Sequence, residues 1–409
     1  MAQRRLVSAL KQRKPGIARI SSSVQIAESK LIARSRGVRR HKSRDRRCFD
    51  AASILLCCLL GVGLSIRAYA DDRDRTIFQF QHTAWTTKVG APGGIVALAQ
   101  SSDGYLWLGT NNGLYRFDGL NFERMDPVTG PAFPSRSVSR LLALANGDLW
   151  IGYRGGGISL LRAGVNRNYG AAQGLPQGRV RSLAQDGEGT IWVGTNGGLG
   201  RFEQGRWKSV AEDWNYPGNA AWGMDLDRQG TLWVATENTI VCLPRAARKF
   251  KTTGIQVGQV PRFADSPAGK IWMAETTRSV RPIPEHGLST ADPEIRVGSN
   301  AILFDREGSL WITTLGDGLR RVPFPERLQS QKIREFSQKI ESFTAKDGLS
   351  GDYMGPILED REGNIWVGTD DGLDQFRKSA LTPLTLSGKF HTNQLVADNG
   401  GGHFDIRSE

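Results

Sequence analysis

Short apolar segments separated by polar turns rich in glycine fill most of the chain after about residue 76. One unit shows the pattern clearly, and its four apolar segments are 180–186, 190–195, 199–202 and 206–210. Short segments joined by tight turns of this kind predict antiparallel strands connected as hairpins. We therefore interpret the unit as one four-stranded blade of a β-propeller.

The same unit recurs seven times. Each copy contains Gly-x-[Leu/Ile]-Trp, followed by an apolar residue and then a small one. The seven tryptophans are Trp107, Trp150, Trp192, Trp233, Trp272, Trp311 and Trp366. A repeat of about 40–45 residues built from short strands is typical of propeller blades. The sequence thus predicts an all-β fold, a seven-bladed β-propeller of four-stranded antiparallel blades.

The fixed positions of the repeat have architectural explanations. The glycine three places before each tryptophan predicts a turn residue with positive φ, which glycine adopts without strain. The small residue two places after the tryptophan is expected where strands converge near the axis and a larger side chain would clash. The tryptophan itself is expected to pack between blades. Thr239 and Ser279 replace the glycine that opens the third strand in units four and five, so these two blades are predicted to be degenerate.

Two further features concern the ring. The segment 76–83 matches the fourth strand of a blade, and 85–94 resembles the connection at 343–352. We therefore predict that the segment before the first repeat completes the last blade and leaves no free sheet edge. The long interval before Trp366 predicts an insertion at 323–339, between the third and fourth strands of the sixth blade. Either a surface loop or a partner-binding excursion would fit it.

The N-terminal region differs from the rest. Residues 1–50 carry 15 Lys or Arg against 3 Asp or Glu, so they hold almost all of the net charge of +13. We expect a basic, disordered leader there, followed at 51–70 by a signal-peptide core that is cleaved near Ala70, or by an uncleaved membrane anchor. Export to the periplasm follows, with anchoring to the inner membrane as the alternative. The nearly neutral body predicts no nucleic-acid binding.

The C-terminal region 386–409 reads as the start of another repeat, after a propeller predicted to span 76–385. Residues 395–401 repeat the pattern of 183–189, and Phe404 stands where the next tryptophan would be. We expect a truncated product whose longer form continues into more repeats.

The repeat resembles that of the two-component regulator propeller family. The clearest matches are 103–119 and 360–376. The resemblance implies the periplasmic sensor part of membrane histidine kinases, including hybrid ones, with oligosaccharides as frequent ligands and a second propeller in many relatives. No β-sandwich, second apolar span or phospho-accepting histidine follows Phe376. The resemblance therefore implies a sensor without its kinase output.

Residues that could carry catalysis are scarce. His82, His286, His391 and His403 are not at metal-ligand spacing, and the motifs of serine hydrolases, phosphate-binding loops and zinc proteases are absent. We predict no catalytic residue, metal or cofactor. Cys242 is expected to be a small buried residue on a strand rather than a reactive thiol. Repeated aspartates near the first turn of a unit favour Asx turns over calcium ligands; they are Asp103, Asp186, Asp227, Asp305 and Asp360.

The candidate ligand-binding residues come from topology. In a propeller, the loops between the second and third strands share one face with the connections between blades, around the axial funnel. Here those loops present Asn111, Asn112, Arg154, Asn196, Glu237, Asn238, Arg278, Asp317, Asp370 and Asp371. Mixed amides and charges suit a ligand rich in hydroxyl groups, such as an oligosaccharide.

Three hypotheses about function remain open at this point. The first is an exported, ligand-sensing propeller of a two-component receptor, joined to the membrane only through its N-terminal segment and able to dimerise or carry a further propeller in a longer form. The second is a propeller lyase or glycosidase, which two carboxyl groups of raised pKa across the funnel would favour. The third is a protein-interaction scaffold, which an exposed apolar patch would favour.

Overall fold

The computed structural model describes residues 75–257, 261–276, 279–283, 294–327 and 340–378, and the backbone of 396–397 and 404–405. The predicted leader 1–50 and the predicted signal or anchor 51–70 lie outside the described residues. So does nearly all of the predicted further repeat. Its described part consists of Val396–Ala397 (β28) and Phe404–Asp405 (β29), which pair antiparallel.

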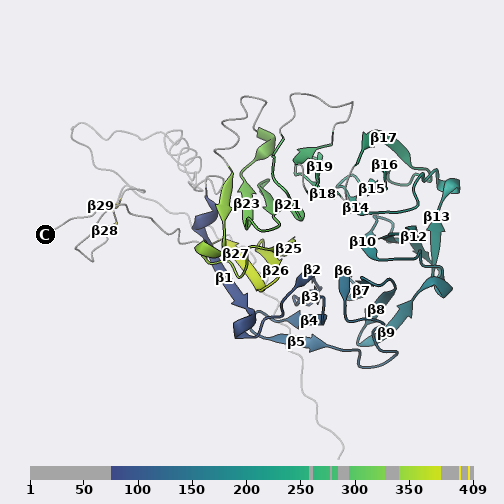
Figure 1. The fold of residues 1–409 in the computed structure, drawn as a ribbon, viewed down its shortest axis with the longest axis horizontal. Helices are drawn as coiled ribbons and strands as arrows, with labels where there is room; N and C mark the ends of the chain where they lie inside the picture. The colour runs from purple at the N-terminus through teal and green to yellow at the C-terminus, as the bar shows by residue number, and fades with distance from the viewer. Residues whose placement is uncertain are drawn as a thin grey trace, which may run out of the picture. The chain divides into compact units, whose positions relative to one another are not determined.

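Seven small antiparallel sheets lie around a central axis as the blades of a propeller (Figure 1). The first blade consists of Ile95–Gln100 (β2), Leu106–Thr110 (β3), Gly113–Phe117 (β4) and Phe122–Met125 (β5). The second consists of Val138–Ala143 (β6), Leu149–Tyr153 (β7), Ile158–Arg162 (β8) and Val165–Tyr169 (β9). The third consists of Val180–Gln185 (β10), Ile191–Thr195 (β11), Gly198–Glu203 (β12) and Arg206–Val210 (β13). The prediction of an all-β propeller is confirmed.

The remaining blades are less uniform. The fourth consists of Gly223–Leu226 (β14), Leu232–Ala235 (β15), Thr239–Leu243 (β16) and Lys251–Gln256 (β17). The fifth has three described strands, Arg262–Asp265 (β18), Ile271–Ala274 (β19) and Val280–Pro282 (β20). The sixth consists of Ala301–Phe304 (β21), Leu310–Thr313 (β22), Leu319–Val322 (β23) and Glu341–Phe343 (β24). The fourth blade, which was expected to be degenerate, is complete, whereas residues 277–278 and 284–293 of the fifth blade lie outside the described residues.

The first segment of the propeller closes the ring, as predicted. The seventh blade consists of Met354–Glu359 (β25), Ile365–Thr369 (β26), Gly372–Lys378 (β27) and, from the other end of the propeller, Phe80–Thr86 (β1). β1 pairs antiparallel with β27 over its whole length, and β25 contacts β2. The closing strand begins later than expected because residues 77–79 form a helical turn instead. Every blade thereby has a neighbour on both sides.

The glycines of the repeat take the conformation that the sequence predicts. All seven that precede a tryptophan by three places have φ between +80° and +98°. The small residues after the tryptophans lie against the next blade. A Cβ atom on Gly152, for instance, would lie 2.4 Å from Cγ1 of Val180 on β10. In the blades with glycine here the neighbouring blade fills the space, and the other blades place only Ala235, Ala274 or Thr313 at this position.

The tryptophans are anchored by the repeated aspartates. The indole N–H groups of four of them donate to the carboxylate six residues earlier, at 2.7–2.8 Å. The aspartates concerned are Asp186, Asp227, Asp305 and Asp360. The same carboxylates accept backbone N–H groups of the turn, which confirms the Asx role. Asp103 was assigned to this group wrongly. In its unit Ser101 accepts the bond from Trp107, and Asp103 accepts the hydroxyl of Ser101.

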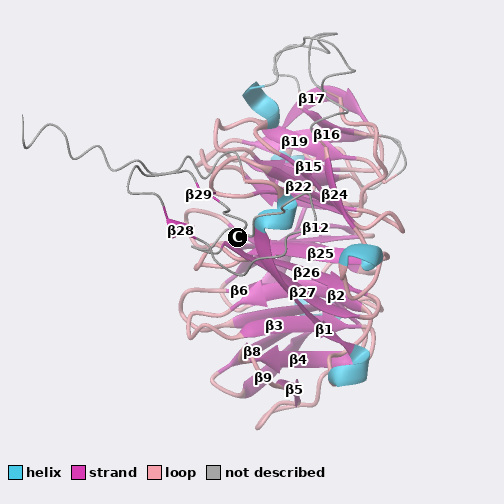
Figure 2. Ribbon diagram, turned by 90° about the vertical axis from the view of Figure 1, so that its left-hand side faces the viewer, coloured by secondary structure: helices cyan, strands magenta, loops and turns pink. Residues whose placement is uncertain are grey.

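Figure 2 shows the propeller edge on, with strands throughout and only short helical turns. These are Ile77–Gln79 (η2), Thr87–Val89 (η3), Ala171–Gln173 (η4), Glu212–Trp214 (η5), Pro325–Arg327 (η6) and Ala345–Asp347 (η7). Within the described ranges, no helix has the length and apolar character needed to cross a bilayer. The predicted insertion falls where expected, since β23 ends at Val322 and β24 begins at Glu341.

Candidate functional site

The loops between second and third strands share one face of the propeller with the connections between blades. Backbone bonds join them: Gly94 N donates to the carbonyl of Asp370 at 2.8 Å, and Gly197 N donates to the carbonyl of Gln177 at 2.9 Å. We call this surface the axial face. It is the face on which the sequence placed the candidate ligand-binding residues.

Nine of the ten candidates lie exposed at hairpin tips, and Arg278 lies outside the described residues. Arg154 joins hairpin tips of two neighbouring blades, whereas the bond to Asn196 comes from Arg181 on β10 of the same blade. Arg154 donates to Oδ1 of Asn111 at 2.8 Å, and Arg181 donates to Oδ1 of Asn196 at 2.7 Å. Six other candidates form no side-chain hydrogen bond to one another: Asn112, Glu237, Asn238, Asp317, Asp370 and Asp371. The structure therefore gathers some of the predicted set and leaves the rest as separate tips.

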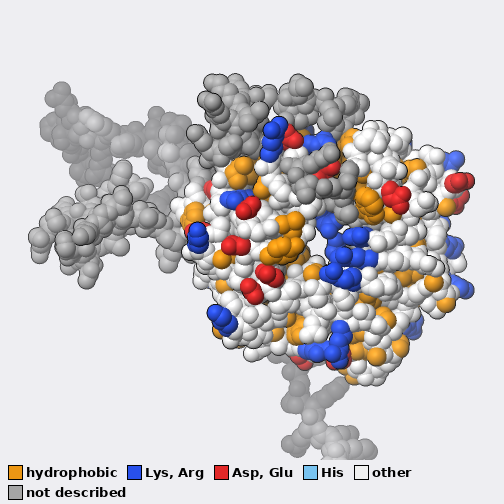
Figure 3. Space-filling view, viewed as in Figure 1, with side chains coloured by type: hydrophobic (Ala, Val, Ile, Leu, Met, Phe, Trp, Pro, Cys, Tyr) orange, Lys and Arg blue, Asp and Glu red, His pale blue; other side chains and the backbone are white. Residues whose placement is uncertain are grey.

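A group of five arginines dominates the axial face, and we call it the axial arginine cluster. Arg140 lies on β6, Arg181 on β10 and Arg262 on β18, all innermost strands of their blades. Arg179 precedes β10 directly, and Arg154 follows β7. Figure 3 shows Lys and Arg side chains gathered along the side of the central hollow over β6 and β10. Three blades thus direct positive charge toward one part of the axis.

The guanidinium groups of the cluster lie close enough together for their positive charges to lower one another's pKa. Burial is the largest cause that lowers the pKa of Arg140, Arg179, Arg181 and Arg262, and neighbouring arginines follow. The pKa of Arg262 falls to about 10, with Arg181 and Arg179 as the contributing charges. The pKa of Arg140 lies well below its usual range. No carboxylate raises the pKa of any of these four groups.

The cluster also leaves most of its hydrogen-bond donors free. A guanidinium carries five N–H donors. Arg140 donates to its neighbour's carbonyl at 2.6 Å, and Arg262 reaches the carbonyl of Pro261 only at 3.5 Å. Arg179 makes no side-chain hydrogen bond within the described ranges, and none of the five arginines pairs with a carboxylate there. The axial face therefore presents unpaired positive charge and unused donors.

Sequence reasoning found Arg154 but missed Arg140, Arg181 and Arg262, which lie on strands, and Arg179, which lies in the connection before β10. The signal lay in the inner strands. Arg140 and Arg262 pair with Gly152 and Ala274, at the same register where other blades place a small residue. Those counterparts are Ala97, Ser182, Gly223 and Ala301. An alignment of the repeats at this position would have shown two arginines among small residues.

Acidic groups occupy another part of the axial face. Figure 3 shows Asp and Glu side chains across the hollow from the arginines, over β25 and β26. The loops of the sixth and seventh blades there contribute Asp317, Asp352, Asp370 and Asp371. The axial face is thus divided into a basic and an acidic side, and the two sides form no ion pair among the described residues.

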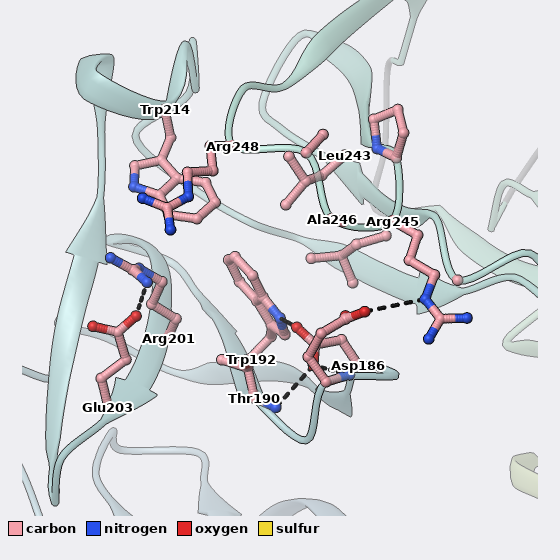
Figure 4. Close-up of a pocket in the computed structure, with 15 residues that line it drawn as sticks. Asp186, Thr190, Trp192, Arg201, Glu203, Trp214, Leu243, Arg245, Ala246 and Arg248 are labelled. Atoms are coloured by element: carbon pink, nitrogen blue, oxygen red, sulfur yellow. Dashed lines mark hydrogen bonds and ion pairs between the residues drawn. The ribbon is translucent and has the colours of Figure 1, made fainter.

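A cavity of about 490 Å³ lies between the third and fourth blades, away from the axial face (Figure 4). Trp192 and Trp214 line it at a centroid separation of 5.9 Å, and the guanidinium of Arg201 lies 4.4 Å from the ring centre of Trp214. Its acidic side chains are engaged, Glu188 with Arg245 and Glu203 with Arg201. With both glutamates held by arginines, the cavity offers no free carboxyl pair for acid–base chemistry.

The carboxyl groups of raised pKa lie elsewhere. Burial raises the pKa of Asp225 to about 7 and raises that of Asp265, and each lies toward the end of an inner strand that leads into the first turn of its blade. They interact with each other between the fourth and fifth blades. Burial also raises the pKa of Glu359, the last residue of β25. The axial face carries none of the three. The arrangement that would favour a glycosidase, two such groups across the funnel, is not formed by the described residues.

His82 and Cys242 have structural surroundings. The ring of His82 packs against Phe343 and Phe376, and its Nε2 lies 2.9 Å from the buried carboxylate of Asp374. Cys242 lies on β16 as predicted, half-buried rather than fully enclosed, and burial raises its thiol pKa. Exposed large apolar side chains are spread over several blades, namely Phe78, Val89, Leu120, Val128, Val165, Leu315 and Tyr353.

Known proteins agree with this architecture. Residues 90–112, 174–197 and 348–371 match the family described as "Two component regulator propeller". The chain therefore carries repeats of this family, as the resemblance indicated. None of the curated proteins matches the chain.

Several solved structures share the fold. The extracellular domain of a hybrid two component system from B. thetaiotaomicron has a TM-score of 0.60 and 17% identity, over 79% of this chain and 46% of that one. A catalytically inactive virginiamycin B lyase from Staphylococcus aureus, solved with quinupristin, has a TM-score of 0.56 and 16% identity, over 73% and 99%. PorZ, a surface component of the type-IX secretion system of Porphyromonas gingivalis, has a TM-score of 0.52 and 15% identity, over 69% and 46%.

These identities show a common fold and nothing finer. The chain spans 46% of the length of the two-component neighbour.

Proposed function

We propose that this chain is an exported, ligand-sensing propeller of a two-component-type receptor, and that it binds a small hydroxylated ligand on the axial face without chemical turnover. The axial arginine cluster is the observation that supports this most directly. Its donors are free, they converge from three blades, and the amides of Asn111 and Asn196 adjoin them. Free, converging donors in a hollow are what a polar ligand requires.

The family repeat supports the sensing role. Repeats of the two-component regulator propeller occupy at least three of the seven blades. The similar structure from B. thetaiotaomicron is an extracellular domain, which agrees with the export expected from the apolar segment at 51–66.

An enzymatic role has less support. A variant of the similar lyase in which a histidine is replaced by alanine is catalytically inactive. The described part of this chain holds one histidine, His82, and its ring is packed in the closing blade against Asp374. The carboxyl groups of raised pKa are remote from the axial loops. The axial face therefore favours binding over proton transfer.

The proposal is tested by titrating the purified chain calorimetrically with neutral and acidic oligosaccharides. We expect at least one to bind, and we expect Asn111→Ala and Asn196→Ala to change its affinity, because these amides adjoin Arg154 and Arg181. Lys249→Ala, an exposed side chain between β16 and β17 on the far face, is the control and should leave affinity unchanged. Cleavage of any oligosaccharide during incubation, seen by chromatography, would contradict the proposal. So would the absence of any binding.

A further inference from the structure

We infer that the axial face is an oxyanion site, in which the axial arginine cluster holds a carboxylate, sulfate or phosphate group of the ligand. This rests on the proposed function, because it assigns the ligand class of the same face. Arg140, Arg179, Arg181 and Arg262 form the inner part of the site, and Arg154 stands at its rim.

The first argument is the lack of any counter-charge. Positive side chains that leave bulk water are usually paired with carboxylates. Arg321 follows this rule, since it is 3% exposed and bonds to Glu341. The axial cluster departs from it, since none of its five members meets a carboxylate among the described residues. The protein therefore holds charge ready for an anion from outside.

The second argument is geometric. Guanidinium groups bind carboxylate, sulfate and phosphate oxygens through two parallel N–H donors. The cluster brings such donors from β6, β10 and β18, which lie in three different blades. Most of these donors are unused: Arg140, for example, makes a single hydrogen bond, to the carbonyl of Ser139.

The third argument concerns the depth of the site. Arg154 is exposed at its hairpin tip, whereas Arg140, Arg179, Arg181 and Arg262 are half-buried. Arg154 is therefore the outer member of the cluster and the other four form its inner part. An elongated ligand could place its acidic group against the inner arginines. Its hydroxyl groups would then contact the amides beside Arg154 and Arg181.

The acidic side of the axial face fits this assignment. Asp317, Asp370 and Asp371 belong to the sixth and seventh blades, away from the cluster. They do not neutralise it, because no carboxylate contributes to the pKa of its inner members. They would repel an anion from their own side, so the anion is directed to the arginines.

The test compares oxyanions with chloride on the full chain and on a paired variant. Arg140→Met with Arg262→Met removes two inner charges and keeps the aliphatic length. Arg167→Met on the exposed strand β9 is the matched control in the same blade as Arg140. Probes are sodium phosphate, sodium sulfate and trigalacturonate, with maltotriose as the neutral trisaccharide and sodium chloride at equal ionic strength. Thermal denaturation and calorimetric titration give the readouts.

We expect at least one oxyanion to raise the melting temperature saturably and beyond the effect of chloride, and trigalacturonate to bind at least tenfold more tightly than maltotriose. The double variant should lose at least tenfold in affinity, while Arg167→Met should not differ from the parent. A response to phosphate and sulfate alone indicates a free or esterified inorganic anion, and a response to trigalacturonate indicates a sugar acid; both support the inference.

An equal response of the parent and the double variant to every oxyanion would overturn the inference, as would oxyanion effects no larger than those of chloride. Maltotriose bound equally by the parent and the double variant, together with no oxyanion binding that the double variant loses, would overturn the oxyanion site and leave ligand sensing standing. Phosphate binding that the double variant loses, with no oligosaccharide bound, would support the oxyanion site and contradict the proposed sensing of oligosaccharides.

Discussion

Replacing Arg262 by methionine should stabilise the protein when no anion is bound. The guanidinium is charged at neutral pH in both the folded and the unfolded chain, but in the folded chain burial and neighbouring arginines lower its pKa to about 10. A base with a depressed pKa destabilises the fold at every pH below that value, and the penalty disappears only as the pH rises beyond about 10.

The magnitude follows from that depression of the pKa. Each tenfold change in the proton-binding constant corresponds to about 1.4 kcal/mol, so the penalty at pH 7 is of the order of 3 kcal/mol. Methionine keeps the aliphatic stem, and the one bond that is lost, to the carbonyl of Pro261, is long at 3.5 Å. We therefore expect Arg262→Met to raise the free energy of unfolding by about 1–3 kcal/mol.

Urea denaturation at pH 7, in chloride and then in phosphate, provides the assay. Phosphate should reduce the difference in unfolding free energy between the variant and the parent, because a bound anion stabilises the parent and not the variant. Arg167→Met should lie within about 0.5 kcal/mol of the parent in both buffers. A variant less stable than the parent in chloride would refute the reasoning, since Arg262 would then contribute packing or bonding that outweighs its unpaired charge.

Three other perturbations have defined outcomes. The pKa of Asp225 is about 7 in the folded chain, above its unfolded value, so stability is lost as the pH rises from about 4 to about 7. Asp225→Asn should therefore raise the free energy of unfolding by about 1–3 kcal/mol at pH 8 and change it little at pH 4, as measured by urea denaturation at both pH values. Gly152→Ala should lower the free energy of unfolding by about 1–3 kcal/mol, because its Cβ would meet the next blade, whereas Gly155→Ala has open space around it and should be neutral. Equal melting temperatures of the two variants would contradict this. His82→Ala should cost about 1–3 kcal/mol because it leaves a buried carboxylate short of a partner in the closing blade, and unchanged hydrogen exchange of β1 would argue against that role.

The architecture could be predicted because the same physical constraints recur in each of the seven repeats. The glycine before each tryptophan has positive φ, and the small residue after it faces the next blade, so both positions tolerate few alternatives. Ring closure was also predictable, because 85–94 repeats the connection at 343–352. The exact start of the closing strand was not, since the helical turn at 77–79 depends on a bond from Ile77 N to the distant Glu341.

The candidate site was predictable only in part. Hairpin tips can be located by counting from the tryptophan, and this gave Arg154, Asn111 and Asn196. The inner arginines belong to strands whose outward pattern looks ordinary. What makes Arg140 and Arg262 unusual is that blades far apart in sequence bring them together without a carboxylate, and this is a property of the closed ring.

The most direct measurement of the central claim is anomalous diffraction from crystals of the full chain soaked in selenate, a sulfate analogue whose selenium can be located unambiguously. The account predicts an anomalous peak in the axial hollow, within hydrogen-bond distance of Arg140, Arg181 or Arg262, and its loss in the double methionine variant. Peaks confined to other arginines of the surface, with an empty axial cluster, would contradict it.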